Sequence, residues 1–98
     1  MEDPELEELI LHLSENPMAG DVIVGTGGCR KLRWRRHGRG KSGGYRTITF
    51  YSGEAMPVFL LAVFAKGERS DLNQDERNQL KRLTSAIVGE YAARAQGQ

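Results

Sequence analysis

The 98-residue sequence is poor in the features that mark secreted, zinc-binding and membrane proteins. Its one cysteine, Cys29, cannot form an internal disulfide, and with His12 and His37 it makes no cluster that has the spacing of a zinc site. The longest apolar run, from Met56 to Ala65, has ten residues, whereas a membrane-spanning helix needs about 20. The acidic first five residues lack the basic and then apolar plan of a signal peptide. These absences favour a cytoplasmic protein that uses no metal and does not contact a membrane.

Acidic residues are also missing from the segment between residues 22 and 53. That segment holds eight Lys or Arg residues, whereas residues 1–21 hold seven acids and no Lys or Arg, and residues 54–98 hold six of each sign. The net charge of +1 hides this segregation. A field of one sign on part of a fold attracts phosphate-bearing or acidic partners whatever the net charge. The eight cations are Arg30, Lys31, Arg33, Arg35, Arg36, Arg39, Lys41 and Arg46.

The length and composition, 39% hydrophobic and 28% charged, indicate one soluble globular domain over residues 1–98. A first helix can be capped by Asp3 and stops at Asn16, because the residue before a proline avoids the helical region. A last helix is predicted from about Asn73 to Ala93, with a capping box at its start, and residues 94–98 are expected to fray.

Three strands separated by glycine-rich turns are predicted between the helices. Residues 30–36 and 45–51 alternate apolar with polar side chains, which is the pattern of half-buried strands. Residues 58–65 are apolar without a break, as expected of a strand buried on both faces, and residues 22–24 can add a short edge strand. The predicted fold class is therefore α+β: a small antiparallel meander of three or four strands with an N-terminal and a C-terminal helix.

Several motifs have a simpler interpretation than a catalytic or cofactor site. Gly40-Lys41-Ser42 lacks a glycine five residues earlier and joins two strands, whereas a phosphate-binding loop opens a helix, so no nucleotide cofactor is expected. Cys29 has no paired histidine and acidic orienter, which indicates a packing residue or a turn neighbour. His12 is interpreted as a partly exposed helix residue, and His37 as a candidate base or a solvated turn residue.

The basic segment is harder to explain without a partner. Lys31, Arg33 and Arg35 share one face of a predicted strand, and such crowding costs stability unless an anion compensates for it. The charge pattern favours phosphate or nucleic acid, and it leaves an acidic protein or no function at all as alternatives. Trp34 and Tyr45 could stack on unpaired bases, although a core position is the preferred interpretation of Trp34.

Three segments carry a resemblance to a known family: residues 25–34 (GTGGCRKLRW), 38–46 (GRGKSGGYR) and 63–72 (VFAKGERSDL). Together they resemble the RelE/HigB superfamily of bacterial type II toxins, specifically the HigB-like branch. The resemblance runs from about Leu6 to Ala86. It implies a RelE-like fold in which the helices pack on one side of a twisted antiparallel sheet.

The resemblance also implies an activity. Such toxins are metal-independent endoribonucleases that enter the ribosomal A site, cut the messenger there and inhibit translation. A cognate helix-turn-helix antitoxin (HigA-like) holds the toxin inactive, and the toxin reaches operator DNA only through that antitoxin. Cleavage of RNA by its own 2′-hydroxyl needs a base, cations for the phosphate and an acid for the leaving oxygen.

By motif, the resemblance assigns catalysis to Lys66, Arg46, Arg33 and Lys31. Lys66 would transfer a proton, and Arg33 and Arg46 would stabilise the charge of the transition state. Lys31 would hold flanking phosphates or ribosomal RNA. RNA or phosphate binding is further assigned to Arg30, Arg35, Arg36, Arg39, Lys41 and Tyr45.

The sequence departs from the family at its N-terminus. Relatives usually carry a further strand before the segment that begins here at Glu5, so the resemblance predicts a missing strand and an exposed sheet edge that a partner could complete. The acidic first helix is expected to hold the C-terminal helix or to bind the antitoxin. The alternative to a nuclease is a module of the same fold that binds RNA or an antitoxin without cutting.

Overall fold

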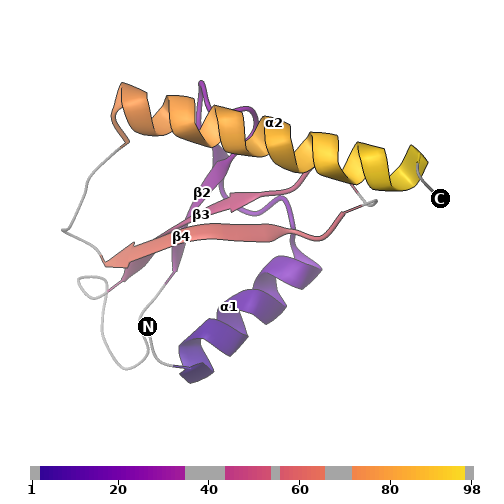
Figure 1. Ribbon diagram of the computed structural model, residues 1–98. Coiled ribbons are helices and arrows are strands. Elements are labelled where there is room, and N and C mark those ends of the chain that lie inside the picture. Colours follow the sequence, from indigo (N-terminus) through magenta and orange to yellow (C-terminus); the bar gives the residue numbers. More distant parts are fainter. Residues whose placement is uncertain (1–2, 35–43, 54–55, 66–71, 97–98) are drawn as a thin grey trace.

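The computed structural model describes residues 3–34, 44–53, 56–65 and 72–96, and these residues form two helices and a four-stranded antiparallel sheet (Figure 1). The elements follow the chain in this order: α1 (Asp3–Glu15), β1 (Asp21–Val22), β2 (Arg30–Trp34), β3 (Tyr45–Phe50), β4 (Phe59–Ala65) and α2 (Gln74–Gln96). The predicted α+β fold is confirmed.

Helix α1 ends where the sequence predicts. The backbone N–H and the side-chain amide of Asn16 both donate to the carbonyl of His12, at 2.8 and 3.1 Å, and so close the last turn before Pro17. The buried residues of the helix include Leu9 and Leu13, which are 0% and 2% exposed. Their spacing of four residues places both on one side of the helix.

The sheet is a meander in the order β1-β2-β3-β4, and its register sorts the side chains onto two faces. Arg33 lies directly opposite Arg46, and Lys31 lies opposite Ile48, so these four side chains share one face. Trp34 lies opposite Tyr45 on the other face. We call the first the α2 face and the second the α1 face, after the helix that covers each.

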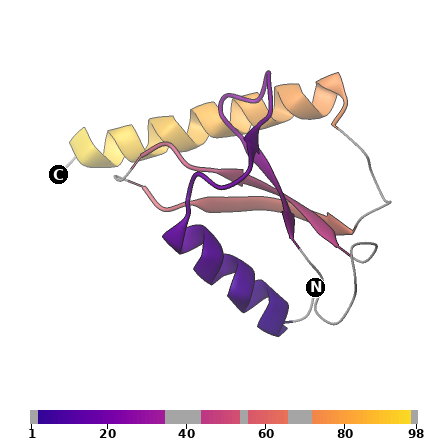
Figure 2. The same cartoon turned by 180° about the vertical axis from the view of Figure 1, so that it is seen from behind.

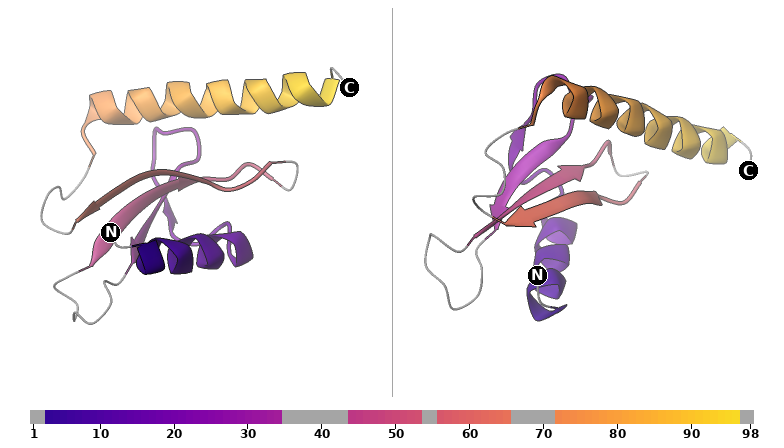
Figure 3. Two further views of the ribbon diagram at one scale, coloured as in Figure 1. Left: turned by 60° about the horizontal axis from the view of Figure 1, so that its bottom comes forward. Right: turned by 60° about the vertical axis from the view of Figure 1, so that its left-hand side comes forward.

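The two helices cover opposite faces of the sheet (Figure 3). The ring of Tyr91 in α2 meets that of Phe59 at 5.9 Å, edge to face, whereas the ring of His12 in α1 lies 5.1 Å from that of Trp34. The expectation that the helices pack on one side was therefore wrong. Apolar side chains alternate onto both faces of β2 and β3, so each face needs its own cover.

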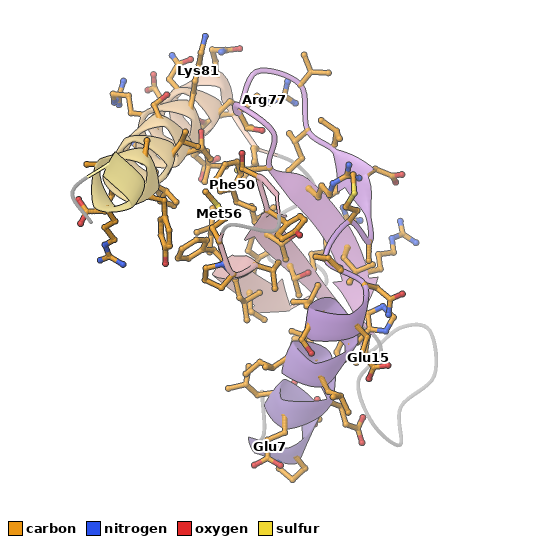
Figure 4. All side chains as sticks on the ribbon, turned by 90° about the vertical axis from the view of Figure 1, so that its right-hand side faces the viewer. Glu7, Glu15, Phe50, Met56, Arg77 and Lys81 are labelled. Atoms are coloured by element: carbon orange, nitrogen blue, oxygen red, sulfur yellow. The ribbon has the colours of Figure 1, made fainter. Side chains whose placement is uncertain are left out.

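Helix α1 also does not hold α2, because the sheet lies between them. Figure 4 places Phe50 and Met56 between the sheet and α2, whereas Glu7 and Glu15 lie on α1 at the far side. The hypothesis that the acidic first helix holds the C-terminal helix is therefore wrong.

Strand β4 is an edge strand and not a strand buried on both faces. None of its described side chains is fully buried, and Val63 is 36% exposed. A register shift between Ile48 and Thr49 of β3 marks an irregularity in its pairing with β4. An unbroken apolar run does not distinguish a central strand from an edge strand whose faces are each covered in part, so the prediction failed here.

Helix α2 has the predicted start and a longer course. The N–H of Asn73 donates to Glu76 Oε1 at 2.9 Å and the N–H of Glu76 donates to Asn73 Oδ1 at 2.8 Å, which is a capping box. The helix continues past Ala93 to Gln96. Arg94 supports the last turn, since its guanidinium lies 3.4 Å from Glu90 and 5.0 Å from the centre of the Tyr91 ring.

The loop between β1 and β2 ties the sheet to α2, as Figure 2 shows. The Thr84 hydroxyl, 1% exposed, donates to the carbonyl of Thr26 at 3.1 Å. Gly27 has a φ of +79°, and a Cβ at this position would collide with Thr84 Oγ1. Only glycine permits both this backbone conformation and this close approach.

The core on the α2 face centres on Ile23, Cys29, Ile48 and Phe50. Cys29 is fully buried, and its backbone N–H donates to the Thr26 hydroxyl at 3.0 Å. Its interpretation as a packing residue is confirmed. Burial raises the pKa of the Cys29 thiol, and a hydrogen bond with Thr26 offsets part of that rise.

Two glycine variants test the contact between the loop and α2. Gly25 and Gly27 both have a positive φ, but a Cβ at Gly25 meets nothing within 4 Å. We expect Gly25→Ala to cost about 1–2 kcal/mol of unfolding free energy through the backbone alone. Gly27→Ala should cost about 1–3 kcal/mol more through the clash with Thr84. Urea unfolding measures both, and equal losses would contradict the described contact.

The raised pKa of Cys29 makes a second prediction. Thiol reagents attack the thiolate, so a buried thiol whose pKa is raised should react at pH 8 about tenfold or more slowly than the same thiol in urea. Labelling with a chromogenic disulfide gives both rates. Fast labelling of the folded protein would show that Cys29 is accessible.

Candidate functional site

Three of the predicted site cations meet in one groove on the α2 face of the sheet. The groove has a volume of about 480 Å³ and is lined by Gly20, Asp21, Lys31, Leu32, Arg33 and Arg46. The residues come from β1, β2 and β3 and the turn before β1. The sequence places Lys31 and Arg33 two residues apart in a strand, and that spacing puts both side chains on the same face.

The register of β2 against β3 adds the third cation. Arg33 and Arg46 are directly paired, which brings their Cα atoms to about 4.5–5.5 Å. Lys31 and Arg33 are exposed and Arg46 is half-buried. Like charges opposite each other on neighbouring strands repel, and an anion in the groove would reduce that repulsion.

The chemistry of the pair suits a phosphodiester. An arginine guanidinium is planar, stays protonated, and binds two oxygens of a phosphate at once. Two guanidinium groups that start from facing positions can bind one phosphate from two sides. The groove can thus hold the phosphate and stabilise the additional negative charge that develops when a nucleophile attacks it.

Two of the predicted phosphate-binding residues lie on the other face. Arg30 points away from the groove residues, because it alternates with Lys31, and its Nη1 donates to the carbonyl of Gly20 at 3.1 Å. Tyr45 is 7% exposed on the α1 face, opposite Trp34. The structure therefore does not bring Arg30 and Tyr45 together with Lys31, Arg33 and Arg46.

The remaining predicted residues stay predictions. Lys66, Arg35, Arg36, Arg39 and Lys41 fall outside the described residues. Their convergence on the groove is untested, and so is the assignment of Lys66 to proton transfer.

Sequence reasoning missed Asp21, the carboxylate of the groove. Asp21 lies in β1 directly opposite Lys31, so the two side chains share the α2 face. In the sequence Asp21 is only the last of the acids that precede the basic segment. The turn glycines between residues 25 and 28 were the available signal, because a hairpin there brings residue 21 back beside residue 31.

The described part of the chain holds neither a cluster of metal ligands nor a helix that could span a membrane. Within it, no three His, Cys, Asp or Glu side chains gather as they would around a metal ion. Over the same ranges, neither helix has the length and apolar character that a bilayer crossing requires.

A comparison with protein families shows what the whole chain is similar to. The family model described as RelE toxin of RelE / RelB toxin-antitoxin system matches residues 1–95. The match covers α1, all four strands, α2 except for its last residue, and every residue that lines the groove.

A binding measurement tests whether the groove holds phosphates. We expect Arg33→Ala and Arg46→Ala each to weaken binding of a single-stranded 2′-O-methyl RNA. Each should also lower the slope of log affinity against log salt by about 0.7 for each phosphate contact that is lost. Arg94→Ala is the control, because it removes the same charge from a site paired with Glu90.

Fluorescence anisotropy at several salt concentrations gives these slopes. If Arg94→Ala changes the affinity and the slope as much as the two groove variants do, the binding follows total charge and the groove has no special part in it.

Proposed function

The chain belongs to the RelE toxin family, and we propose on this premise that it is a ribosome-dependent endoribonuclease that cuts messenger RNA and so inhibits translation. Toxins of this family are generally ribosome-dependent ribonucleases. We further propose that the chain belongs to the HigB-like branch, on the three segments that carry that resemblance.

The observation that supports cleavage is the pairing of Arg33 with Arg46 beside Lys31 in one groove. Side chains that served only to attract a polyanion could be scattered over a surface. Here two guanidinium groups face one small volume, in which a single phosphate can bind both. This arrangement fits stabilisation of a pentacoordinate phosphate better than it fits a general attraction.

The proposed reaction uses the nucleophile that RNA itself carries. The 2′-oxygen attacks the adjacent phosphorus, the bond from phosphorus to the 5′-oxygen breaks, and the products end in a 2′,3′-cyclic phosphate and a 5′-hydroxyl. Arg33 and Arg46 neutralise the charge that develops on the phosphoryl oxygens. Lys31 holds a neighbouring phosphate, and Lys66 donates a proton to the leaving 5′-oxygen.

The contacts that RNA would make outside the groove are proposed from the sequence alone. Arg35, Arg36, Arg39 and Lys41 belong to the basic segment and would contact flanking phosphates or ribosomal RNA. Arg30 and Tyr45 lie on the α1 face, so any contact that they make with RNA would be separate from the groove.

We propose that the activity of this toxin is regulated by an antitoxin, as in its family. RelE toxins pair with a cognate antitoxin. We propose that the partner here is a helix-turn-helix protein of the HigA kind, which neutralises the toxin and carries it to operator DNA. The acidic helix α1 lies on the face away from the groove, and this position leaves it available to such a partner.

Primer extension on a messenger in a reconstituted translation reaction tests the function. Wild-type protein should cut within codons held by the ribosome. Arg46→Ala should reduce the cleavage rate by about 10²–10³-fold, the range seen when one charge-stabilising donor is removed. Arg94→Ala should cut as the wild type does, because Arg94 lies on α2 beside Glu90.

Circular dichroism and thermal melting show whether Arg46→Ala is folded. If folded wild-type protein binds ribosomes without cutting the messenger, the proposed nuclease activity is wrong. The alternative, a module that binds RNA or an antitoxin without cutting, is then favoured. If folded Arg46→Ala cuts at the wild-type rate, the proposed nuclease activity still holds, but Arg46 has no part in the catalytic site.

A further inference from the structure

Asp21 is the one acidic side chain among the residues that line the groove, in the part of the chain that the structure describes. It lies opposite Lys31 on the α2 face and is exposed to solvent. The preceding residue, Gly20, has a φ of +94°, and a Cβ there would collide with the carbonyl oxygen of Lys31. Glycine at this position lets β1 approach β2 and so places Asp21 beside the cations.

Among the described residues, the other charged side chains that line the groove are cationic. They are Lys31 and Arg33 on β2 and Arg46 on β3, while Arg30 binds the Gly20 carbonyl from the other face. The ammonium of a lysine and the guanidinium of an arginine are hydrogen-bond donors without an acceptor, whereas a carboxylate oxygen can accept a proton. Among the described side chains of the groove, Asp21 is therefore the one proton acceptor.

The position of Asp21 also suits the proposed reaction. Asp21 is paired with Lys31, and Arg33 is the diagonal neighbour two residues along, at about 7–8 Å. A phosphate held by Arg33 and Arg46 would thus lie to one side of the carboxylate. A general base must come within about 2.6–3.2 Å of the hydroxyl that it deprotonates. Asp21 and the arginine pair line the same groove, so a 2′-hydroxyl next to a phosphate bound there could approach the carboxylate.

The Asp21 carboxylate lies in the groove without an ion pair to any described residue. No contact within 4.0 Å joins Asp21 to a cation among the described residues, although three cations line the same groove. A carboxylate that served to neutralise Lys31 would be expected to bind it. Asp21 instead lines the groove together with the three cations.

We propose that Asp21 is the general base that accepts the proton of the attacking 2′-hydroxyl, an inference that rests on the proposed function. The proton passes from the 2′-oxygen to an Asp21 carboxylate oxygen while the 2′-oxygen bonds to phosphorus. The bond from phosphorus to the 5′-oxygen breaks, and Lys66 protonates that oxygen. Asp21 later releases its proton to solvent.

The test is the single-turnover cleavage rate on ribosomes at saturating toxin between about pH 6 and about pH 8.5. If a carboxylate takes the proton, the wild-type rate should be nearly level over this range. A lysine base would make the rate rise about tenfold per pH unit over much of it. This wild-type profile alone can overturn the proposal, whatever the stability of any variant.

Substitution gives the second readout. Asp21→Asn should lower the single-turnover rate by about 10²–10⁴-fold, the usual contribution of a general base. Its affinity for ribosomes should not fall, because no cation is removed, and its residual rate should rise with pH as hydroxide replaces the base. Asp21→Glu should recover part of the rate. Asp75→Asn, an exposed carboxylate in the first turn of α2, is the matched control and should cleave normally.

The outcomes separate the two proposals. A wild-type protein that does not cut would overturn the proposed function itself. A wild type that cuts, with Asp21→Asn cutting at the same rate, would leave the function standing and overturn the role of Asp21. A wild-type rate that rises tenfold per pH unit would mean that a lysine or hydroxide removes the proton, and it would also overturn the role of Asp21.

Discussion

The register of β2 against β3 is the constraint on which the groove depends. It pairs Arg33 with Arg46 and leaves Lys31 beside them on the same face. A slip of one residue would move Arg33 and Lys31 to the α1 face and would separate them from Arg46. The pairing of two cations costs about 0.2–1 kcal/mol, so the sheet is less stable for carrying the site. A phosphate bound between the two guanidinium groups would reduce their repulsion.

Packing on both faces of the sheet holds this register. Helix α1 buries Leu9 and Leu13 on its side, while α2 covers Ile48 and Phe50 on the other. Because each face carries its own apolar set, a slipped register would expose both sets to water. The loop from Ile23 to Cys29 is fixed to α2 through Thr84, and the same loop connects β1 to β2. The contact between this loop and the helix therefore supports the position of Asp21 relative to Lys31.

Local pattern predicted the fold class and both helices, because alternation and capping act over a few residues, whereas the family resemblance assigned Lys31, Arg33 and Arg46 to one site. Arg33 and Lys31 share a strand face by their spacing, and the capping box of Asn73 and Glu76 is visible in the chain. Features that depend on pairing between residues far apart in the sequence could not be predicted from the local pattern. The edge position of β4, the placement of the helices on opposite faces and the entry of Asp21 into the groove each depend on which strand pairs with which. Arg30 and Tyr45 were assigned by motif, and strand parity places both on the other face.

The central claim is that Arg33 and Arg46 bind the phosphate of RNA in the groove, and the arginine Nε–H signals in a nitrogen-correlated NMR spectrum report on it directly. A 2′-O-methyl RNA lacks the attacking hydroxyl and so can be titrated without being cut. The account predicts that the signals of Arg33 and Arg46 shift with saturation, while those of Arg30, bound to Gly20, and Arg94, beside Glu90, do not. Shifts confined to Arg30 or Arg94, with Arg33 and Arg46 unmoved, would contradict it.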